Sequence, residues 1–267
     1  MSFRVLSYSY KGGTGRTTST ANIAAALAQN HSVLCIDLDV DAPGLGILFG
    51  FYDNLRGIKD YNLYLQDYLT CEDPASFDIE KALIDVSKES GTGLKFNKTL
   101  KVFPSKIKYP KSISFTGNTT AQRLESLLKK IEETGEFEYI ILDSPSGFGE
   151  MAAISMYVSE YILLFFRYCL QHVEGTIQIS HFINKLALDY LPVATSVPRD
   201  NPGFTEPMKV EILKKLTGRD IFEIPENNSL KWNERIVLFD SEDKFPGIKK
   251  MQACYSNLAN KLVKERR

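Results

Sequence analysis

Short apolar runs alternate with helical patterns along most of this 267-residue chain. Such alternation is typical of a three-layer α/β fold, in which helices cover both faces of a mostly parallel, twisted sheet. The apolar runs predict strands over residues 3–8, 32–36, 99–103, 137–142, 161–166, 191–197 and 221–224. The helical patterns cover residues 17–29, 119–133, 150–157, 172–188, 207–216 and 248–265. Ligands of such folds bind beyond the carboxyl ends of the strands, so the polar residues there are candidates for a site.

Composition places the chain among ordinary soluble globular proteins, since 43% of its residues are hydrophobic and its formal net charge is −1. An α/β fold of about 250 residues commonly forms one domain. We therefore expect a single domain over residues 1–267, with an irregular elaboration at about 51–94. The near-neutral charge gives no overall attraction for nucleic acid or anionic lipid, so either partner would need a local patch.

The cysteines and the apolar runs exclude further classes of protein. The four cysteines lie far apart without a CxxC pair, a spacing that indicates reduced thiols rather than a disulfide framework, a zinc site or an iron–sulfur site. No stretch approaches the roughly 18 uninterrupted apolar residues of a membrane span. These features predict a cytoplasmic protein.

A glycine-rich loop, KGGTGRTT at residues 11–18, separates the first predicted strand from an alanine-rich helix. Gly12, Gly13 and Gly15 can adopt positive φ and bring backbone amides close to an anion. The helix that follows directs its positive end at the same point. This arrangement is the phosphate-binding loop of P-loop nucleotide-binding proteins.

Two positions depart from the strict P-loop pattern G-x-x-x-x-G-K-[ST], which asks for glycine at Tyr10 and lysine at Arg16. The deviant Walker A pattern KGGxGK[ST], which begins with a lysine of its own, fits better. It is matched by Lys11, Gly12, Gly13, Gly15 and Thr17. The sequence therefore resembles the ParA/MinD family of ATPases, which have the P-loop NTPase form of the α/β fold.

The resemblance implies that ATP or ADP is bound with Mg²⁺ by Lys11, Gly12, Gly13, Thr14, Gly15, Arg16, Thr17 and Thr18. Lys11 would reach the phosphates, commonly those of the partner subunit in a dimer held together by ATP. Thr17 would bind Mg²⁺ through its hydroxyl, and Thr18 would face the α-phosphate. Arg16 is not a conservative replacement for lysine, because its guanidinium is planar and prefers a two-pronged contact. We expect it to preserve nucleotide binding and to slow hydrolysis.

Two later strands end in acidic residues. Asp37, Asp39 and Asp41 alternate at the end of the second strand, where they would repel one another without a nearby cation or charged donor. By resemblance to the switch I region of the family, Asp39 would lie near Mg²⁺ and position or activate the attacking water. Asp37 would support this loop, and Asp41 could take either role.

The segment EFEYIILDSPSG resembles the Walker B strand and switch II loop of the same family. Asp143 would hold Mg²⁺ through water, and Gly147 would let the loop respond to the γ-phosphate. The segment IFEIPENNSL resembles the one that lines the purine, so Pro225 and Asn227 are candidates for base contact. The Asn-Arg pair usual after the preceding strand is replaced here by residues 195–198, TSVP, which leaves the identity of the base open.

Two further features point to other partners. Residues 94–111 carry six lysines among aromatic residues, a pattern that can bind nucleic acid, although these lysines also border a predicted core strand. The C-terminal helix has Leu258, Leu262 and Val263 on one side and ends in KERR, as membrane-surface helices do. It fits the last packing helix of the family better, and we expect no membrane binding.

These motifs together predict a MgATP-binding, ATP-hydrolysing switch that dimerises on ATP and controls positioning or the binding of an unidentified protein partner. Hydrolysis would depend on Lys11, Arg16 and Asp39, and the metal would be held by Thr17, Asp39 and Asp143. Two alternatives stay open. One is an ATP-binding module without hydrolysis, and the other is an ATP-dependent ligase or amidotransferase of the same superfamily.

Overall fold

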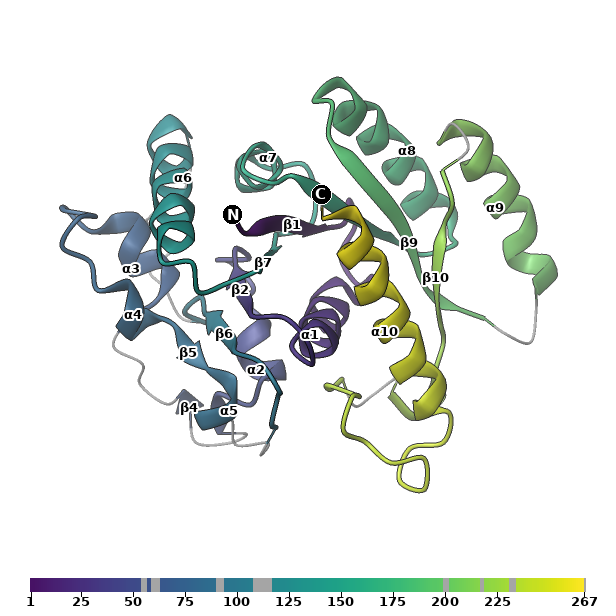
Figure 1. Ribbon diagram of the computed structural model, residues 1–267. Helices are drawn as coiled ribbons and strands as arrows, with labels where there is room; N and C mark the ends of the chain where they lie inside the picture. Colours follow the sequence, from purple (N-terminus) through teal and green to yellow (C-terminus); the bar gives the residue numbers. More distant parts are fainter. Residues whose placement is uncertain are drawn as a thin grey trace.

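The computed structural model describes residues 1–53, 57–58, 63–89, 94–107, 117–198, 202–216, 219–230 and 234–266. Within them, one sheet has the strand order β10-β9-β8-β1-β7-β2-β6-β5 (Figure 1). Its strands are β1 Phe3–Tyr8, β2 Val33–Asp37, β5 Ile84–Asp85, β6 Leu100–Phe103, β7 Tyr139–Asp143, β8 Tyr161–Phe166, β9 Asp189–Val197 and β10 Phe222–Pro225. A separate antiparallel pair consists of β3 Tyr52–Asp53 and β4 Gly57–Ile58.

All seven predicted strands are present, and they pair in parallel. The sequence does not predict β5, which runs antiparallel to β6 with Ile84 opposite Val102. A strand of two residues is too short to show an alternating pattern. The predicted class, a mostly parallel sheet covered by helices, is confirmed.

The longer helices are α1 Arg16–Leu27, α6 Gly117–Glu133, α7 Glu150–Tyr157, α8 Leu170–Lys185, α9 Pro202–Lys215 and α10 Ile248–Glu265. The shorter ones are α2 Leu45–Leu48, α3 Leu65–Thr70, α4 Ile79–Ala82, α5 Val86–Glu89 and the 3₁₀ helix η1 Asn228–Leu230. α7 and α10 have the predicted bounds. α9 begins at Pro202 rather than at residue 207, because Pro202 takes the first helical position, where the missing amide costs nothing, and Pro207 lies inside the helix.

The two faces of the sheet pack against different helices. Successive residues of a strand point to opposite faces. Val5 of β1 accordingly packs in the core with α1 and α10, and its neighbour Leu6 packs in the core with α6, α7 and α8. Figure 1 shows these two groups of helices on opposite sides of the sheet.

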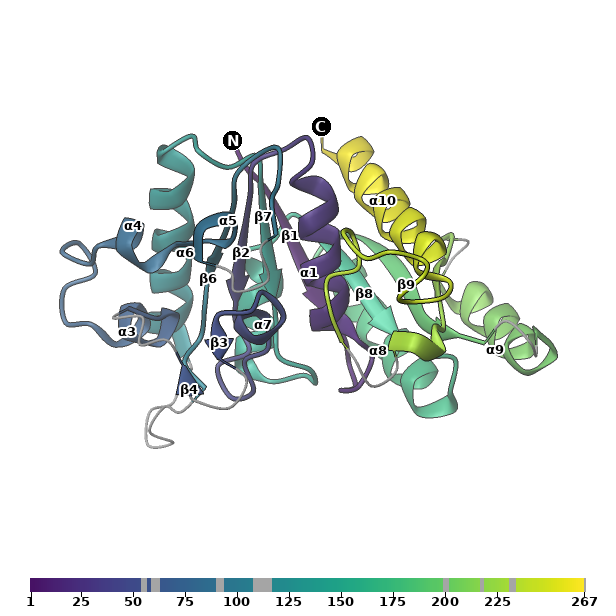
Figure 2. The ribbon, with the colours of Figure 1, turned by 90° about the horizontal axis from the view of Figure 1, so that it is seen from below.

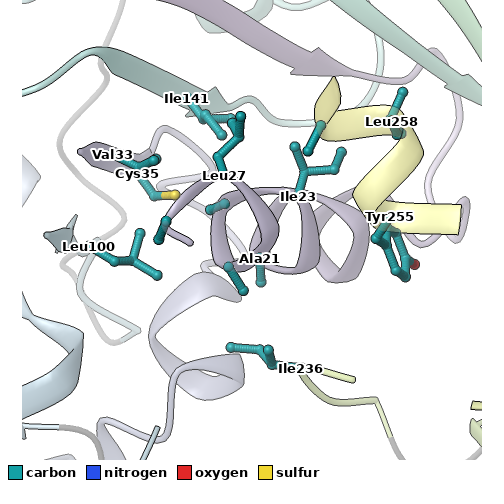
Figure 3. Close-up of a cluster of buried hydrophobic side chains, with 14 of the residues drawn as sticks. Ala21, Ile23, Leu27, Val33, Cys35, Leu100, Ile141, Ile236, Tyr255 and Leu258 are labelled. Atoms are coloured by element: carbon teal, nitrogen blue, oxygen red, sulfur yellow. The ribbon is translucent and has the colours of Figure 1, made fainter. Parts of the chain in front are cut away.

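Helix α1 is enclosed by the sheet and by α10. The two helices lie side by side (Figure 2). Ile23 of α1 lies near Leu258 of α10, and Leu27 lies near Cys35 and Ile141 of the sheet (Figure 3). The alanine-rich sequence of α1 permits this close approach, because small side chains bring the backbones together. The N-terminus of α1 is therefore held firmly at the edge of the sheet.

The predicted elaboration, residues 51–94, consists of short elements where it is described. Tyr68 of α3 is buried next to α6, and its hydroxyl donates to the carbonyl oxygen of Arg123 at 3.3 Å. This part of the chain thus packs against α6 and also adds the edge strand β5 to the sheet. Residues 54–56, 59–62 and 90–93 of the predicted elaboration lie outside the described residues.

The lysine-rich stretch contributes to the packing at the sheet border. Lys101 forms an ion pair with Glu136 at 2.6 Å, and the Lys106 ammonium lies 5.4 Å from the centroid of the Tyr64 ring. The last two lysines of the stretch, at 108 and 111, lie outside the described residues. Nucleic-acid binding by this stretch stays a prediction.

The C-terminal helix α10 buries Leu258 and Leu262 in the core, as expected of a packing helix. In the part of the chain that the structure describes, no helix combines the length and the apolarity needed to cross a bilayer.

Candidate functional site

The carboxyl ends of β1, β2 and β7 meet at one edge of the sheet. Their parallel register places Asp143 opposite Ser7 on one side and opposite Asp37 on the other. The glycine-rich loop after β1 and the acidic segments that end β2 and β7 are therefore neighbours in space, although they are far apart in sequence.

The glycine-rich loop leads directly into α1. Gly13 and Gly15 have φ angles of 74° and 70°, which residues with a Cβ rarely adopt. Gly12 does not use the positive φ that the sequence allows it. Among the described residues, no side chain caps the start of α1, and the first turn of α1 contains no acidic residue. The first amides of α1 and the positive end of its dipole are thus suited to an external anion.

Arg16, the first residue of α1, contacts both acids that the sequence assigns to the metal. Its Nε donates to Asp143 Oδ1 at 3.1 Å, and its Nη2 donates to Asp39 Oδ2 at 3.0 Å. The hydroxyl of Thr17 donates to Asp143 Oδ2 at 2.7 Å, and that of Thr20 donates to Asp143 Oδ1 at 3.0 Å. The structure therefore brings together four predicted site residues and adds Thr20, which the sequence does not single out.

The network is almost closed to solvent. Arg16 is 7% exposed and Asp143 is fully buried. Burial would lower the pKa of Arg16, but the carboxylates of Asp143 and Asp39 raise it, and the guanidinium stays charged. Burial raises the pKa of Asp39, an effect that the neighbouring Arg16 opposes. Arg16 is thus the buried counter-ion of this acidic site.

Asp37 organises the loop that follows β2. Its carboxylate accepts hydrogen bonds from the backbone amides of Asp39 at 3.2 Å and of Gly44 and Leu45 at 3.1 Å each. Burial, together with the charge of Asp143, raises the pKa of Asp37 well above its ordinary value. The supporting role that the sequence assigns to Asp37 matches these contacts, whereas Asp41 is exposed.

The oxygen donors of this site suit Mg²⁺. The Thr17 hydroxyl and the carboxylates of Asp39 and Asp143 are hard ligands, and Mg²⁺ in nucleotide sites takes one or two carboxylates together with phosphates and waters. Within the described ranges, no three His, Cys, Asp or Glu side chains form a metal-binding cluster of their own. Thr17, Asp39 and Asp143 could therefore hold Mg²⁺ together with phosphates and waters.

A cavity of about 250 Å³ opens beside the loop. It extends from the start of α1 to the end of β10 and to α10. Six of the residues that line it are Thr14, Gly15, Thr18, Pro225, Asn227 and Tyr255. Both candidates for base contact therefore line the same cavity as the glycine-rich loop.

Asn227 is held by contacts within the chain. Its Nδ2 donates to the carbonyl oxygen of Pro246 at 3.3 Å, and its Oδ1 accepts from the amide of Ser229 at 2.9 Å. These contacts fix the turn after β10. The structure places Asn227 at the cavity wall as expected, with its side-chain amide already in use.

Two residues that the sequence does not assign to the site support the cavity. Asn22 of α1 donates to the carbonyl oxygen of Arg235 at 2.9 Å and accepts from the amide of Val237 at 2.8 Å, which ties a distant segment to α1. The Thr195 hydroxyl lies within hydrogen-bond distance of the carbonyl oxygens of Thr14 and Phe166. Thr195 thus fixes the glycine-rich loop from the strand where the sequence suggests a base contact.

Lys11 lies apart from the buried network. It is exposed, and its ammonium is 5.7 Å from the centroid of the Tyr10 ring. The loop after β7 closes the other side of the site, where the hydroxyl of Tyr8 donates to the carbonyl oxygen of Gly147 at 2.9 Å and the Gly147 amide donates to that of Ser9 at 3.2 Å. Gly147 has φ 85°, which favours glycine at this turn.

Comparison with known proteins places the chain among nucleotide-binding proteins. Residues 4–192 match the AAA_31 family model, described as an AAA domain. An ATP-binding protein of Methanocaldococcus jannaschii is 28% identical over 252 residues, which cover 90% of this chain and 83% of that protein. A ParA family protein of Chlamydia trachomatis is 25% identical over 211 residues, which cover 74% of each chain.

Solved structures have the same fold. The septum site-determining protein MinD of Pyrococcus horikoshii, complexed with Mg-ADP, superposes with a TM-score of 0.73 at 19% identity, over 100% of this chain and 99% of that one. Three observations point to the same family. The glycine-rich loop leads into α1, acidic residues end β2 and β7, and the family model matches residues 4–192. The chain therefore belongs to the AAA_31 family of AAA domains and is a ParA/MinD-like P-loop ATPase.

Proposed function

We propose that this protein binds ATP with Mg²⁺ at the glycine-rich loop, hydrolyses it slowly, and acts as a molecular switch. One observation carries the proposal: the uncapped start of α1 lies between a buried acidic network and a cavity of about 250 Å³. The amides offer a site for phosphates, the acids offer one for a cation, and the cavity offers one for a base.

The residues would divide these tasks by position. The loop amides from Gly13 to Thr18 would bind the phosphates, with the positive end of the α1 dipole behind them. Thr17, Asp39 and Asp143 would hold Mg²⁺, which neutralises charge on the phosphate oxygens when it is bound. Asp39, which is partly exposed, would orient the attacking water.

The cavity would hold the base against Pro225 and the turn fixed by Asn227. The Asn227 amide already contacts Pro246 and Ser229, so its part in base recognition would be to hold the wall. Backbone groups of this turn would then recognise the base through hydrogen bonds. We propose a purine as the base, on the resemblance of residues 221–230 to the segment that lines the purine.

The switch would operate through a dimer formed at the same edge of the sheet. Lys11 is exposed there, and the loop after β7 and the start of α8 add Phe148 and Leu170, which are 54% and 63% exposed. Exposed apolar side chains around an anion site suit contact with a second copy. We propose that Lys11 of one copy reaches the phosphates of the other and that nucleotide state sets affinity for a protein partner.

The remaining parts of the proposal concern organisation and place. The chain would act as one domain over residues 1–267, in the cytoplasm.

A second candidate function, ATP binding without hydrolysis, has one observation in its favour: the Arg16 guanidinium forms ion pairs with Asp39 and Asp143. In that case the protein would bind ATP and stay in one conformation.

Light scattering with ATP, with ADP and without nucleotide, followed by phosphate release from the same samples, tests the proposal. We expect a dimer with ATP only, and phosphate release that is lost on Lys11→Ala. Binding and dimerisation without phosphate release would favour the non-hydrolysing module. Monomers under every condition would remove the switch.

A further inference from the structure

The side chain of Arg16 bridges two carboxylates in place of extending toward the loop. Its Nε and Nη2 contact different acids, Asp143 at 3.1 Å and Asp39 at 3.0 Å. A lysine at this position has a single charged nitrogen, whereas the planar guanidinium has several donors that point in different directions within its plane. The replacement that the sequence shows at residue 16 is thus the one that allows this bridge.

The bridge uses the acceptors that a metal would need. Asp143 Oδ1 accepts from both Arg16 and Thr20, and Asp143 Oδ2 accepts from Thr17. Arg16 Nη2 also lies 3.3 Å from the Thr17 hydroxyl. All three groups assigned to Mg²⁺ in the proposed function are therefore in contact with the guanidinium.

The negative charges of the site explain why Arg16 forms this bridge. Asp37 lies opposite Asp143 in the paired strands and accepts from the amide of Asp39, so the three carboxylates are close enough to repel one another. Among the described ion pairs, those of Asp39 and Asp143 are with Arg16. The guanidinium is 7% exposed and supplies the positive charge that neighbouring carboxylates otherwise take from a cation.

We propose that Arg16 is an internal counter-ion that competes with Mg²⁺ for Asp39 and Asp143. A metal can use these carboxylates only when the guanidinium leaves them, so the affinity of the site for a divalent cation is reduced by the cost of breaking a buried ion pair. Nucleotide binding then depends less on Mg²⁺ than it does in a protein with lysine at this position. This inference deepens the proposed function. Its claim about nucleotide binding rests on that function, whereas its claim about metal affinity does not.

The test uses Mn²⁺, a paramagnetic substitute for Mg²⁺, titrated into the full chain without nucleotide and followed by electron paramagnetic resonance. We expect Arg16→Gln and Arg16→Lys to bind Mn²⁺ at least about tenfold more tightly than the wild type, since each loses the two-acid bridge. Arg4→Gln is the matched control, because Arg4 also bridges two carboxylates, Glu125 and Glu132, near the opposite end of β1. It should bind Mn²⁺ as the wild type does.

Equal Mn²⁺ affinity in the wild type and in a folded Arg16→Lys variant would overturn the inference. Circular dichroism establishes which variants are folded, and Arg16→Lys, which keeps a positive charge, covers the case in which Arg16→Gln does not fold. Calorimetry with ADP in Mg²⁺ or in EDTA gives a second readout: the ratio of the two affinities should be smaller for the wild type than for Arg16→Lys. Absence of ADP binding would reject the proposed function, while the Mn²⁺ titration would still decide the competition.

Discussion

Gly175 of α8 lies so close to the ring of Tyr10 that a Cβ at residue 175 would overlap it. Tyr10 stands where the strict P-loop pattern has glycine, and it comes directly before Lys11. The missing side chain at residue 175 therefore makes room for the large one at residue 10. This contact sets the path of the chain as it enters the glycine-rich loop.

Gly175→Ala should displace the Tyr10 ring and with it the start of the loop. We expect a loss of stability of about 1–3 kcal/mol, the usual cost of overpacking a well-packed site. Nucleotide affinity should fall as well, because the loop amides move. Urea denaturation and calorimetry with ATP measure the two effects.

The double variant Tyr10→Ala, Gly175→Ala separates steric overlap from other effects. If the ring is the obstacle, the second substitution restores most of the stability lost on Gly175→Ala, and the two changes are strongly non-additive. Additive losses would show that Gly175 is required for a reason unrelated to Tyr10.

Arg16→Ala should destabilise the protein in the absence of metal and nucleotide. The substitution leaves the buried Asp143 carboxylate without its counter-ion, which costs about 3–5 kcal/mol when one partner of a buried pair is removed. The midpoint of urea denaturation in EDTA measures this loss. Lys129→Ala removes an exposed partner of Glu125 and should change the midpoint much less. Equal effects would contradict a buried counter-ion at residue 16.

Asn22→Leu should weaken the wall of the cavity. The buried amide of Val237 loses its acceptor, and an unsatisfied buried donor costs about 1–3 kcal/mol. Nucleotide binding should weaken too, since Asn22, Arg235 and Val237 line the cavity. Gln29→Leu in the turn after α1 is the control, because the Gln29 side chain contacts only the carbonyl oxygen of Ala25 among the described hydrogen bonds. Denaturation and calorimetry on both variants decide whether Asn22 has this role.

His172 should make stability fall in acid. Burial lowers its pKa below the ordinary 6.5, and the charges of Arg167 and Lys11 lower it further. Its buried Nδ1 has no hydrogen-bond partner among the described atoms. The unfolded chain therefore binds more protons than the folded one below about pH 6.5, and this contribution to stability is lost as pH falls toward the folded-state pKa.

Urea denaturation at about pH 7.5 and about pH 5.5 tests this sign. The wild type should lose more stability than His172→Gln over that interval. His181 lies on the same helix and is exposed, so His181→Gln should keep the pH dependence of the wild type. A wild type and a His172→Gln variant with the same pH dependence would show that His172 does not titrate in this way.

The alternation of apolar runs was sufficient to predict the seven parallel strands and the order of most helices. Strands such as β7 and β8 are buried on both faces, and their long apolar runs identify them. The parallel pairing then explains why loops far apart in sequence meet at one edge. The sequence could not predict β5, whose two residues pair antiparallel with β6.

The site was predicted by residue type and spacing, but the direction of its side chains was not. The motif predicts that Arg16 contacts the phosphates, whereas in the structure its guanidinium contacts Asp39 and Asp143. Which groups the guanidinium contacts depends on the buried charges around it, and the spacing of residues in the sequence does not reveal those charges. The contact of Tyr10 with Gly175 joins the loop after β1 to α8, and neither segment has a sequence pattern that predicts it.

A pattern did exist for Asn22, which interrupts the alanine-rich run of α1 with a polar side chain. A buried amide within an apolar helix needs partners, and its three hydrogen bonds supply them. Thr195 is different, because a threonine in a strand is common. Its contact with the loop appears only when the strands are assembled.

Calorimetric titration of the full chain with ATP in the presence of Mg²⁺ tests most directly whether the amides at the start of α1 bind a nucleotide. Gly15 and Gly135 have similar left-handed φ angles, 70° and 65°, so substitution by alanine strains both to a similar extent. The account predicts one ATP per chain, with affinity reduced at least about tenfold by Gly15→Ala and unchanged by Gly135→Ala. Titrations that reveal no binding of ATP, ADP or GTP to the folded wild type would contradict it.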